Sequence, residues 1–178
     1  MNSQVLRKIY YQTCCYELEV FKPGNHSVYS KIQGMNQLKF KYAAKISSNC
    51  LTDKKLSFGE SIFLSAKKCQ IAFNSNYNLG IIILCAPILR VYSQGFKNFK
   101  QRLNSFLNSI SEKDGEQIIN AIKLVKPGGI KNYKGSGNVL TTNKLSFNEV
   151  MRIGSKWDRI SKCYIDNYKE ILDFGIPV

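Results

Sequence analysis

The sequence is poor in the residues that build metal-dependent and nucleophilic sites. One histidine, His26, occurs among 178 residues, and the six cysteines form neither a C-x-x-C pair nor a cluster with metal-ligand spacing. A zinc site built from several histidines and cysteines is therefore excluded. A Ser-His or Cys-His mechanism would have to use His26, and no G-x-S-x-G motif accompanies it. We expect the cysteines to be reduced and buried, since several lie within apolar helical patterns; they are Cys14, Cys15, Cys50, Cys69, Cys85 and Cys163.

Long apolar runs are also missing. The most apolar stretch, Ile81 to Leu89, is too short to span a bilayer, and Met1 to Tyr10 lacks the apolar core of a signal peptide. We therefore expect a soluble, cytoplasmic protein without a membrane partner. Hydrophobic residues make up 44% of the chain, which suits one ordinary globular domain over residues 1–178.

Acidic residues are few compared with basic ones. The chain has 12 Asp and Glu against 26 Lys and Arg, a formal net charge of +14. Such an excess favours an anionic partner. However, the basic residues are spread singly, with no run of five or more. Two interpretations therefore stay open, a general compositional bias and a selected anion-binding surface.

The apolar pattern predicts an all-α chain, a multi-helix array with long ligand-binding loops. Patterns of the form Ser-x-x-Glu or Ser-x-x-Asp, typical of helix starts, begin at Ser57, Ser111 and Ser146. On the last helix, Gly154 and Trp157 fall on the buried stripe, and the glycine would allow a close helix crossing. The expected helices cover about residues 5–20, 38–50, 57–73, 79–92, 96–110, 111–124 and, as one long final helix, 146–172.

The apolar stretch from Leu79 to Leu89 suits a buried strand as well as a buried helix. We interpret it as a helix that extends to about Tyr92, because its neighbours are helical and no alternating strand patterns accompany it. Pro87 would then kink this helix or shift its backbone pairing.

Two loops carry side chains that suit a phosphorylated ligand. Lys22-Pro23-Gly24-Asn25 offers a cation, a rigid turn, an open backbone position and a carboxamide. In Asn76-Tyr77-Asn78-Leu79-Gly80, Asn78 would cap the following helix while Asn76 faces a ligand. The alternative in each case is an ordinary turn or helix cap.

Two further segments are candidates for the same site. Pro127-Gly128-Gly129 begins a basic, glycine-rich loop that extends to Asn143 and would close over an anionic ligand, although it is not a Walker A motif. Asp158 and Arg159 flank Trp157 on the final helix. The alternatives are a solvated loop for the first segment and a surface ion pair or a solvated face for the second.

Taken together, these segments resemble the ATP:dephospho-CoA triphosphoribosyltransferase family, whose members are also called triphosphoribosyl-dephospho-CoA synthases. The resemblance covers the chain from about Tyr11 onward and is closest to the archaeal and methylotroph branch. It is carried by Glu17–Asn25, Gly34-Met35, Asn76–Pro87, Lys126–Gly129 and Trp157–Tyr164.

The resemblance implies an all-α fold and transfer of the triphosphoribosyl group of ATP to dephospho-CoA, or to a related phosphorylated acceptor, with release of adenine. It implies Mg²⁺, bound as Mg-ATP. By position, Lys22 and Asn25 would contact phosphates, Asn76 and Asn78 would hold ribose or phosphate oxygens, and the glycines would let the backbone approach the ligand. Glu17, Glu19 and Asp158 are the candidate catalytic carboxylates, with Glu17 and Asp158 also as metal ligands. The implied glycine positions are Gly24, Gly80, Gly128 and Gly129.

Several positions depart from the family pattern. The family has histidine, aspartate and arginine where this chain has Ser27, Asn138 and Trp157; in addition Gln33 replaces a histidine and Tyr77 a threonine. The family also continues with further helices beyond Val178, which a homo-oligomer or a second polypeptide would have to supply. Two alternative functions therefore stay open: a nucleotide-binding homologue with impaired catalysis, and a basic nucleic-acid-binding protein.

Overall fold

The computed structural model describes residues 2–21, 26–30, 34–131, 133, 135, 137–140 and 145–175, without the side chains of 129 and 131. All regular elements within these ranges are helices, so the all-α prediction is confirmed. No helix in the described ranges is long and apolar enough to cross a membrane. The elements are α1 (Ser3–Glu19), α2 (Gln37–Leu51), α3 (Phe58–Phe73), α4 (Leu79–Tyr92), α5 (Phe99–Asn108), α6 (Glu112–Val125), α7 (Gly128–Lys131), α8 (Phe147–Gly154), α9 (Arg159–Ile165) and the π-helix η1 (Glu170–Gly175).

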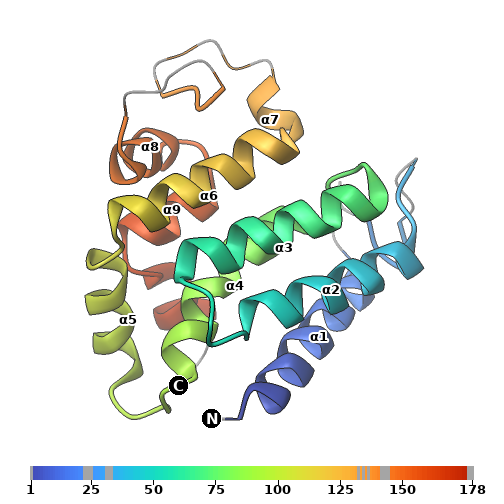
Figure 1. The fold of residues 1–178 in the computed structure, drawn as a ribbon, viewed down its shortest axis with the longest axis horizontal. Coiled ribbons are helices and arrows are strands. Elements are labelled where there is room, and N and C mark those ends of the chain that lie inside the picture. Colours follow the sequence, from blue (N-terminus) through green and yellow to red (C-terminus); the bar gives the residue numbers. More distant parts are fainter. Residues whose placement is uncertain are drawn as a thin grey trace.

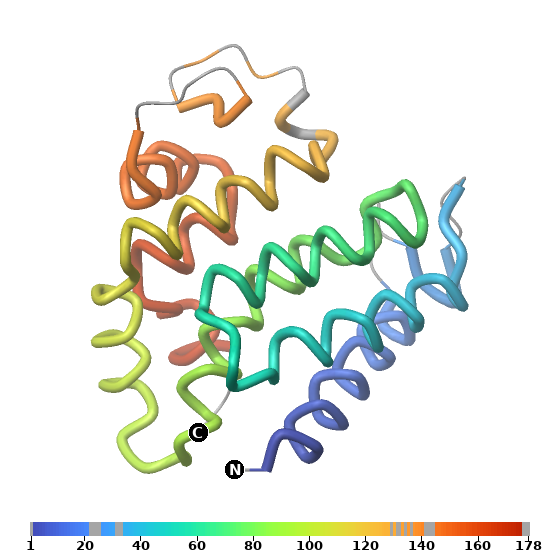
Figure 2. The backbone as a smooth tube through the Cα atoms, in the orientation of Figure 1, coloured from blue at the N-terminus to red at the C-terminus, as the bar shows by residue number. Residues whose placement is uncertain are grey.

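The helices form a packed array in which some contacts join neighbours in the sequence and others join distant helices (Figure 1). Helix α1 packs on α2, α2 on α3, and α3 on α6, so that these four helices follow one another across the molecule (Figure 2). The apolar helix α4 lies behind α3 and contacts α1, α2, α3, α5, α6 and α9. Its central place explains why nearly every position of α4 is apolar.

Serine residues are the N-caps of three helices, as predicted. Ser57 and Ser146 each form a complete capping box, in which the hydroxyl accepts the N–H of the glutamate three residues later and that glutamate accepts the serine N–H. Ser111 accepts the N–H of Asp114 at 3.1 Å. These short-range patterns therefore locate the starts of α3, α6 and α8 correctly.

Hydrogen bonds to the Asp114 carboxylate link the start of α6 to the start of α3. One carboxylate oxygen, Oδ1, accepts the Ser57 hydroxyl at 2.6 Å and the Gly59 N–H at 2.7 Å, and Oδ2 accepts the Ser111 hydroxyl at 3.0 Å. Partial burial alone would raise the pKa of this carboxyl. The three hydrogen bonds, together with the charge of Arg90, hold the pKa of Asp114 below its ordinary value instead. The carboxylate form therefore stabilises the junction of the two helices.

The Asp114 contacts predict a pH-dependent contribution to stability. Because the folded protein lowers this pKa, the contribution is present above the ordinary carboxyl pKa and is lost as pH falls through the folded value. We expect Asp114→Asn to lower the free energy of unfolding at neutral pH by about 1–2 kcal/mol. Thermal unfolding of both proteins between neutral pH and about pH 3 should show this difference shrinking with acidification. A difference that is constant over this range would contradict the assignment.

The stretch from Leu79 to Tyr92 is a helix and contains Pro87, as predicted. Proline has no N–H, so the carbonyl of Ile83 cannot receive its usual helical hydrogen bond. The hydroxyl of Tyr164 donates to this carbonyl at 2.8 Å, and the hydroxyl of Tyr168 donates to the carbonyl of Leu84 at 2.8 Å. Two tyrosines from the C-terminal part of the chain therefore satisfy the backbone next to the proline.

The prediction of one long final helix is wrong. Helix α8 ends at Gly154, whose carbonyl accepts the N–H groups of Trp157 and Asp158, and the Asp158 side chain then caps α9. A second break follows at Asn167 and Tyr168, both with positive φ. Consequently Trp157 does not lie on the buried face of a helix, contrary to the prediction, but is 58% exposed.

Three smaller predictions can be compared with the structure. All six cysteines are free; four are buried, whereas Cys15 and Cys85 are half-buried. Residues 128–131, expected in a loop, form the short helix α7. A β-carbon on Gly154 would lie 2.7 Å from the Ser161 hydroxyl, so this glycine does permit a close approach, at the corner between α8 and α9.

Candidate functional site

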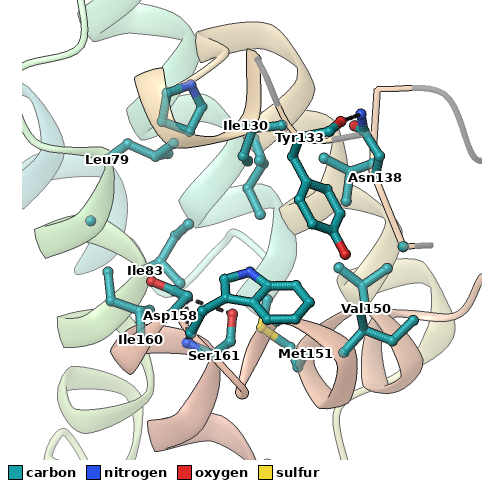
Figure 3. A pocket seen from close by; sticks show the side chains of 18 of the residues that line it. Leu79, Ile83, Ile130, Tyr133, Asn138, Val150, Met151, Asp158, Ile160 and Ser161 are labelled. Atoms are coloured by element: carbon teal, nitrogen blue, oxygen red, sulfur yellow. Dashed lines mark hydrogen bonds between the residues drawn. The ribbon is translucent and has the colours of Figure 1, made fainter. Parts of the chain in front are cut away.

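A cavity of about 480 Å³ lies between the start of α4 and the C-terminal helices (Figure 3). Its volume is within the range of small-molecule binding sites. The wall combines aliphatic side chains with a few polar and aromatic groups. It consists of Asn76, Leu79, Gly80, Ile83, Ile122, Pro127, Ile130, Tyr133, Gly137, Asn138, Val139, Val150, Met151, Ile153, Gly154, Trp157, Asp158, Ile160 and Ser161.

The start of α4 contributes two of the predicted residues, Asn76 and Gly80. The Asn76 side chain accepts the N–H of Leu79 at 3.1 Å and thus caps the helix. A β-carbon on Gly80 would approach the Ile160 side chain to 3.1 Å, so the glycine leaves room for α9 beside α4.

The sequence predicts that Asn78 caps α4 while Asn76 faces a ligand, but the side-chain cap comes from Asn76 instead. Asn78 occupies the N-cap position without capping through its side chain. It is buried, and its amide donates to the Ser47 hydroxyl at 3.0 Å, where the Tyr10 hydroxyl also lies at 3.1 Å. Asn78 therefore connects the loop before α4 to Ser47 of α2 and, through Ser47, to Tyr10 of α1. Asn76 both caps α4 and lines the cavity.

The segment after α7 forms the opposite side of the cavity. Asn138 is buried, donates to the Tyr133 carbonyl and accepts the Leu140 N–H at 2.9 Å. Gly137 has φ +81°, and a β-carbon there would lie 2.9 Å from the Ile153 side chain. This glycine is needed both for the backbone conformation and for the close approach to α8.

Asp158 is the one carboxylate among the described residues of the wall. Its Oδ2 accepts the Ser161 N–H at 2.7 Å and the Ser161 hydroxyl at 2.5 Å, which fixes the side chain at the start of α9 (Figure 3). Arg159 pairs with Glu170 at 2.8 Å, so the suggested surface ion pair forms with a different carboxylate. Asp158 therefore remains a candidate for ligand chemistry.

The structure unites only some of the predicted site residues. Asn76, Gly80 and Asp158 line the cavity together. Glu17 and Glu19 lie near the end of α1, half-buried and exposed respectively, and line no part of this wall. Gly128 and Gly129 lie in α7, next to the lining residue Pro127. The predicted Lys22, Gly24 and Asn25 fall outside the described residues.

Sequence reasoning missed two aromatic members of the wall. The rings of Tyr133 and Trp157 lie with their centroids 5.3 Å apart and their planes tilted by 44°. The helical period, continued past Asp158, predicts Trp157 in the core. The aspartate itself was the available signal, since Asp followed by a polar residue three positions later is typical of a new helix start.

The wall provides limited means of holding Mg²⁺. No group of three His, Cys, Asp or Glu side chains that suits a metal ion occurs in the described part of the chain. Mg²⁺ is often bound by one or two carboxylates together with substrate phosphates and water. Asp158, whose two hydrogen bonds both use Oδ2, fits such a single-carboxylate role through Oδ1.

Comparison with known proteins places the chain in a family. A search of curated proteins and a search of solved structures each found no significant similarity. The family model described as CitG, ATP:dephospho-CoA triphosphoribosyl transferase, matches residues 3–178. This match includes every described residue of the cavity wall. The chain therefore belongs to the ATP:dephospho-CoA triphosphoribosyl transferase family, a transferase family of coenzyme-related biosynthesis.

Proposed function

We propose that this chain transfers the triphosphoribosyl group of ATP to a hydroxyl of 3′-dephospho-CoA, or of a related phosphorylated acceptor, and releases adenine. The observation that carries the proposal is the family match over residues 3–178. The geometry supports it, because Asn76, Pro127 and Asp158, which are far apart in the sequence, lie on one cavity wall.

The reaction exchanges one bond at the ribose for another. The bond between C1′ and N9 of adenine breaks, a bond between C1′ and the acceptor oxygen forms, and the acceptor hydroxyl loses its proton. The released base takes up one proton, so the reaction is balanced without a redox partner. We assign acceptance of the hydroxyl proton to the Asp158 carboxylate, which Ser161 holds in place at the cavity wall.

The triphosphate needs cationic and amide partners. The described wall residues include no lysine or arginine, and we propose that Lys22 and Asn25 supply these contacts. Asn76 is assigned to ribose or phosphate oxygens, whereas the amide of Asn78 is engaged with Ser47. Mg²⁺, when bound with ATP, would neutralise phosphate charge, and Asp158 would be its protein ligand.

The proposal is tested by adenine release. The protein incubated with ATP, Mg²⁺ and dephospho-CoA should form free adenine and an acceptor that is heavier by one triphosphoribosyl group, measured by chromatography and mass spectrometry. We expect Asp158→Asn to slow adenine release by about 10²-fold or more, the range of a lost general base. Asparagine is a good N-cap, so α9 should stay intact in this variant.

A matched control changes a carboxylate remote from the wall. Asp173 pairs with Lys100 at 2.9 Å and does not line the cavity. Asp173→Asn should leave adenine release unchanged. If the unaltered protein binds ATP but forms no adenine with dephospho-CoA or related acceptors, the proposal is wrong and a binding function is favoured.

A further inference from the structure

The pair of aromatic rings at the cavity is not explained by packing of the core. Trp157 is 58% exposed, yet its ring lies 5.3 Å from that of Tyr133, and both residues line the cavity. In Figure 3 the Tyr133 ring projects from its backbone toward α8 and α9. An exposed tryptophan beside a second aromatic ring offers a flat, polarisable surface to a ligand.

The backbone holds Trp157 in a defined position. The carbonyl of Gly154 accepts the N–H of Trp157 at 3.0 Å and that of Asp158 at 2.8 Å. The hydrogen bonds from Ser161 then fix the next residue, Asp158. The turn that carries the indole is therefore organised before any ligand binds, which reduces the entropy lost on binding.

The rest of the wall indicates which part of a nucleotide this surface suits. Apart from Asp158, the described lining side chains carry no charge, and most are aliphatic. A triphosphate would find no lysine or arginine on the described wall and would need Mg²⁺ wherever it faced Asp158. A neutral, planar ring system would instead meet two aromatic rings and a largely aliphatic wall, with a few polar groups at its edge.

We propose that Trp157 and Tyr133 bind the adenine base of a nucleotide substrate by stacking. This inference rests on the proposed function and deepens it by assigning the base subsite. Stacking on aromatic side chains is a general means of binding bases. The base belongs either to ATP or to the adenosine part of dephospho-CoA. Because Trp157 and Asp158 line the same cavity, a base bound here would share that cavity with the carboxylate assigned to the reaction.

The chain offers a direct probe, because Trp157 is its single tryptophan. We expect its fluorescence to be quenched, with saturation, by adenine, ATP and dephospho-CoA. 4′-Phosphopantetheine, which lacks the base, should leave the emission unchanged. If ATP alone quenches, the subsite belongs to the donor; if dephospho-CoA alone quenches, it belongs to the acceptor. Quenching by 4′-phosphopantetheine but by no adenine compound would overturn the inference.

Variants separate stacking from other contacts. Calorimetry with whichever adenine compound quenches should show Trp157→Ala weakening its affinity by about tenfold or more, within the range for a lost base stack. Trp157→Phe, which keeps a ring, should recover most of the affinity. The control Phe96→Ala removes an aromatic side chain that is 72% exposed and does not line the cavity, and should change nothing. Affinity within about twofold of the unaltered protein in Trp157→Ala would overturn the inference, since a lost stack costs more than that.

The two proposals fail in different ways. If adenine is released but Trp157→Ala binds both substrates normally, the base subsite is wrong and the proposed function stands. If no adenine is released but the adenine compounds bind in a Trp157-dependent manner, the subsite stands and the proposed function is wrong. An unaltered protein that binds neither ATP nor dephospho-CoA overturns both.

Discussion

Gly59→Ala is expected to lower the free energy of unfolding by about 2 kcal/mol, within the range for overpacking. A β-carbon at this position would lie 2.4 Å from the backbone oxygen and 2.6 Å from the Cα of Asp114. Both are backbone atoms of α6, so no side chain can rotate away. The helices α3 and α6 would have to separate, which would also stretch the 2.7 Å hydrogen bond from the Gly59 N–H to Asp114.

Urea unfolding followed by circular dichroism measures this effect. Alanine favours a helix over glycine by up to about 1 kcal/mol, which offsets part of the loss but not all of it. The matched control is Gly128→Ala, because a β-carbon on Gly128 would meet nothing within 4 Å. This control should unfold at the same urea concentration as the unaltered protein or slightly higher. A Gly59→Ala variant as stable as the control would show that α3 and α6 can separate without cost.

Local sequence patterns predicted much of this fold but not the contacts between helices. The Ser57 capping box located the start of α3 because both partners lie within four residues. The same segment gave no sign that Gly59 touches α6, since that requires a partner 55 residues away. The break before α9 does not follow from the apolar pattern, because the helical period continues past Asp158 even though its side chain caps a new helix.

At the candidate site, too, local sequence patterns identify individual residues but not the contacts between distant segments. The asparagines before α4 and the aspartate before α9 were selected from the sequence, and Asn76 and Asp158 do line one cavity. Their roles were harder to assign, because Asn78 is engaged by Ser47 of α2, 31 residues away. The pairing of Trp157 with Tyr133 depends on the turn after α8 and the segment after α7 meeting in space. No local sequence pattern predicts this contact between the two rings.

A second large effect is expected at Pro87, where α4 depends on the C-terminal part of the chain. Tyr164→Phe removes the 2.8 Å hydrogen bond to the Ile83 carbonyl, which Pro87 cannot replace. The carbonyl would remain buried without a donor, and we expect the free energy of unfolding to fall by about 2 kcal/mol. Urea unfolding of the variant and the unaltered protein measures the loss.

A double-mutant cycle tests the cause of this loss. Pro87→Ala supplies an N–H that can bond to the Ile83 carbonyl within the helix, so Tyr164→Phe should cost less in the Pro87→Ala background, with a coupling of about 1 kcal/mol. Tyr168→Phe is the matched control. Its hydroxyl bonds to the Leu84 carbonyl, whose helical donor would be the N–H of Ile88 and not of residue 87. The coupling of Pro87 should therefore be larger with Tyr164 than with Tyr168. Absent coupling at both tyrosines would mean that their hydroxyls act independently of the proline. Equal coupling at both would mean that the missing N–H of residue 87 is not the specific cause of the loss at Tyr164.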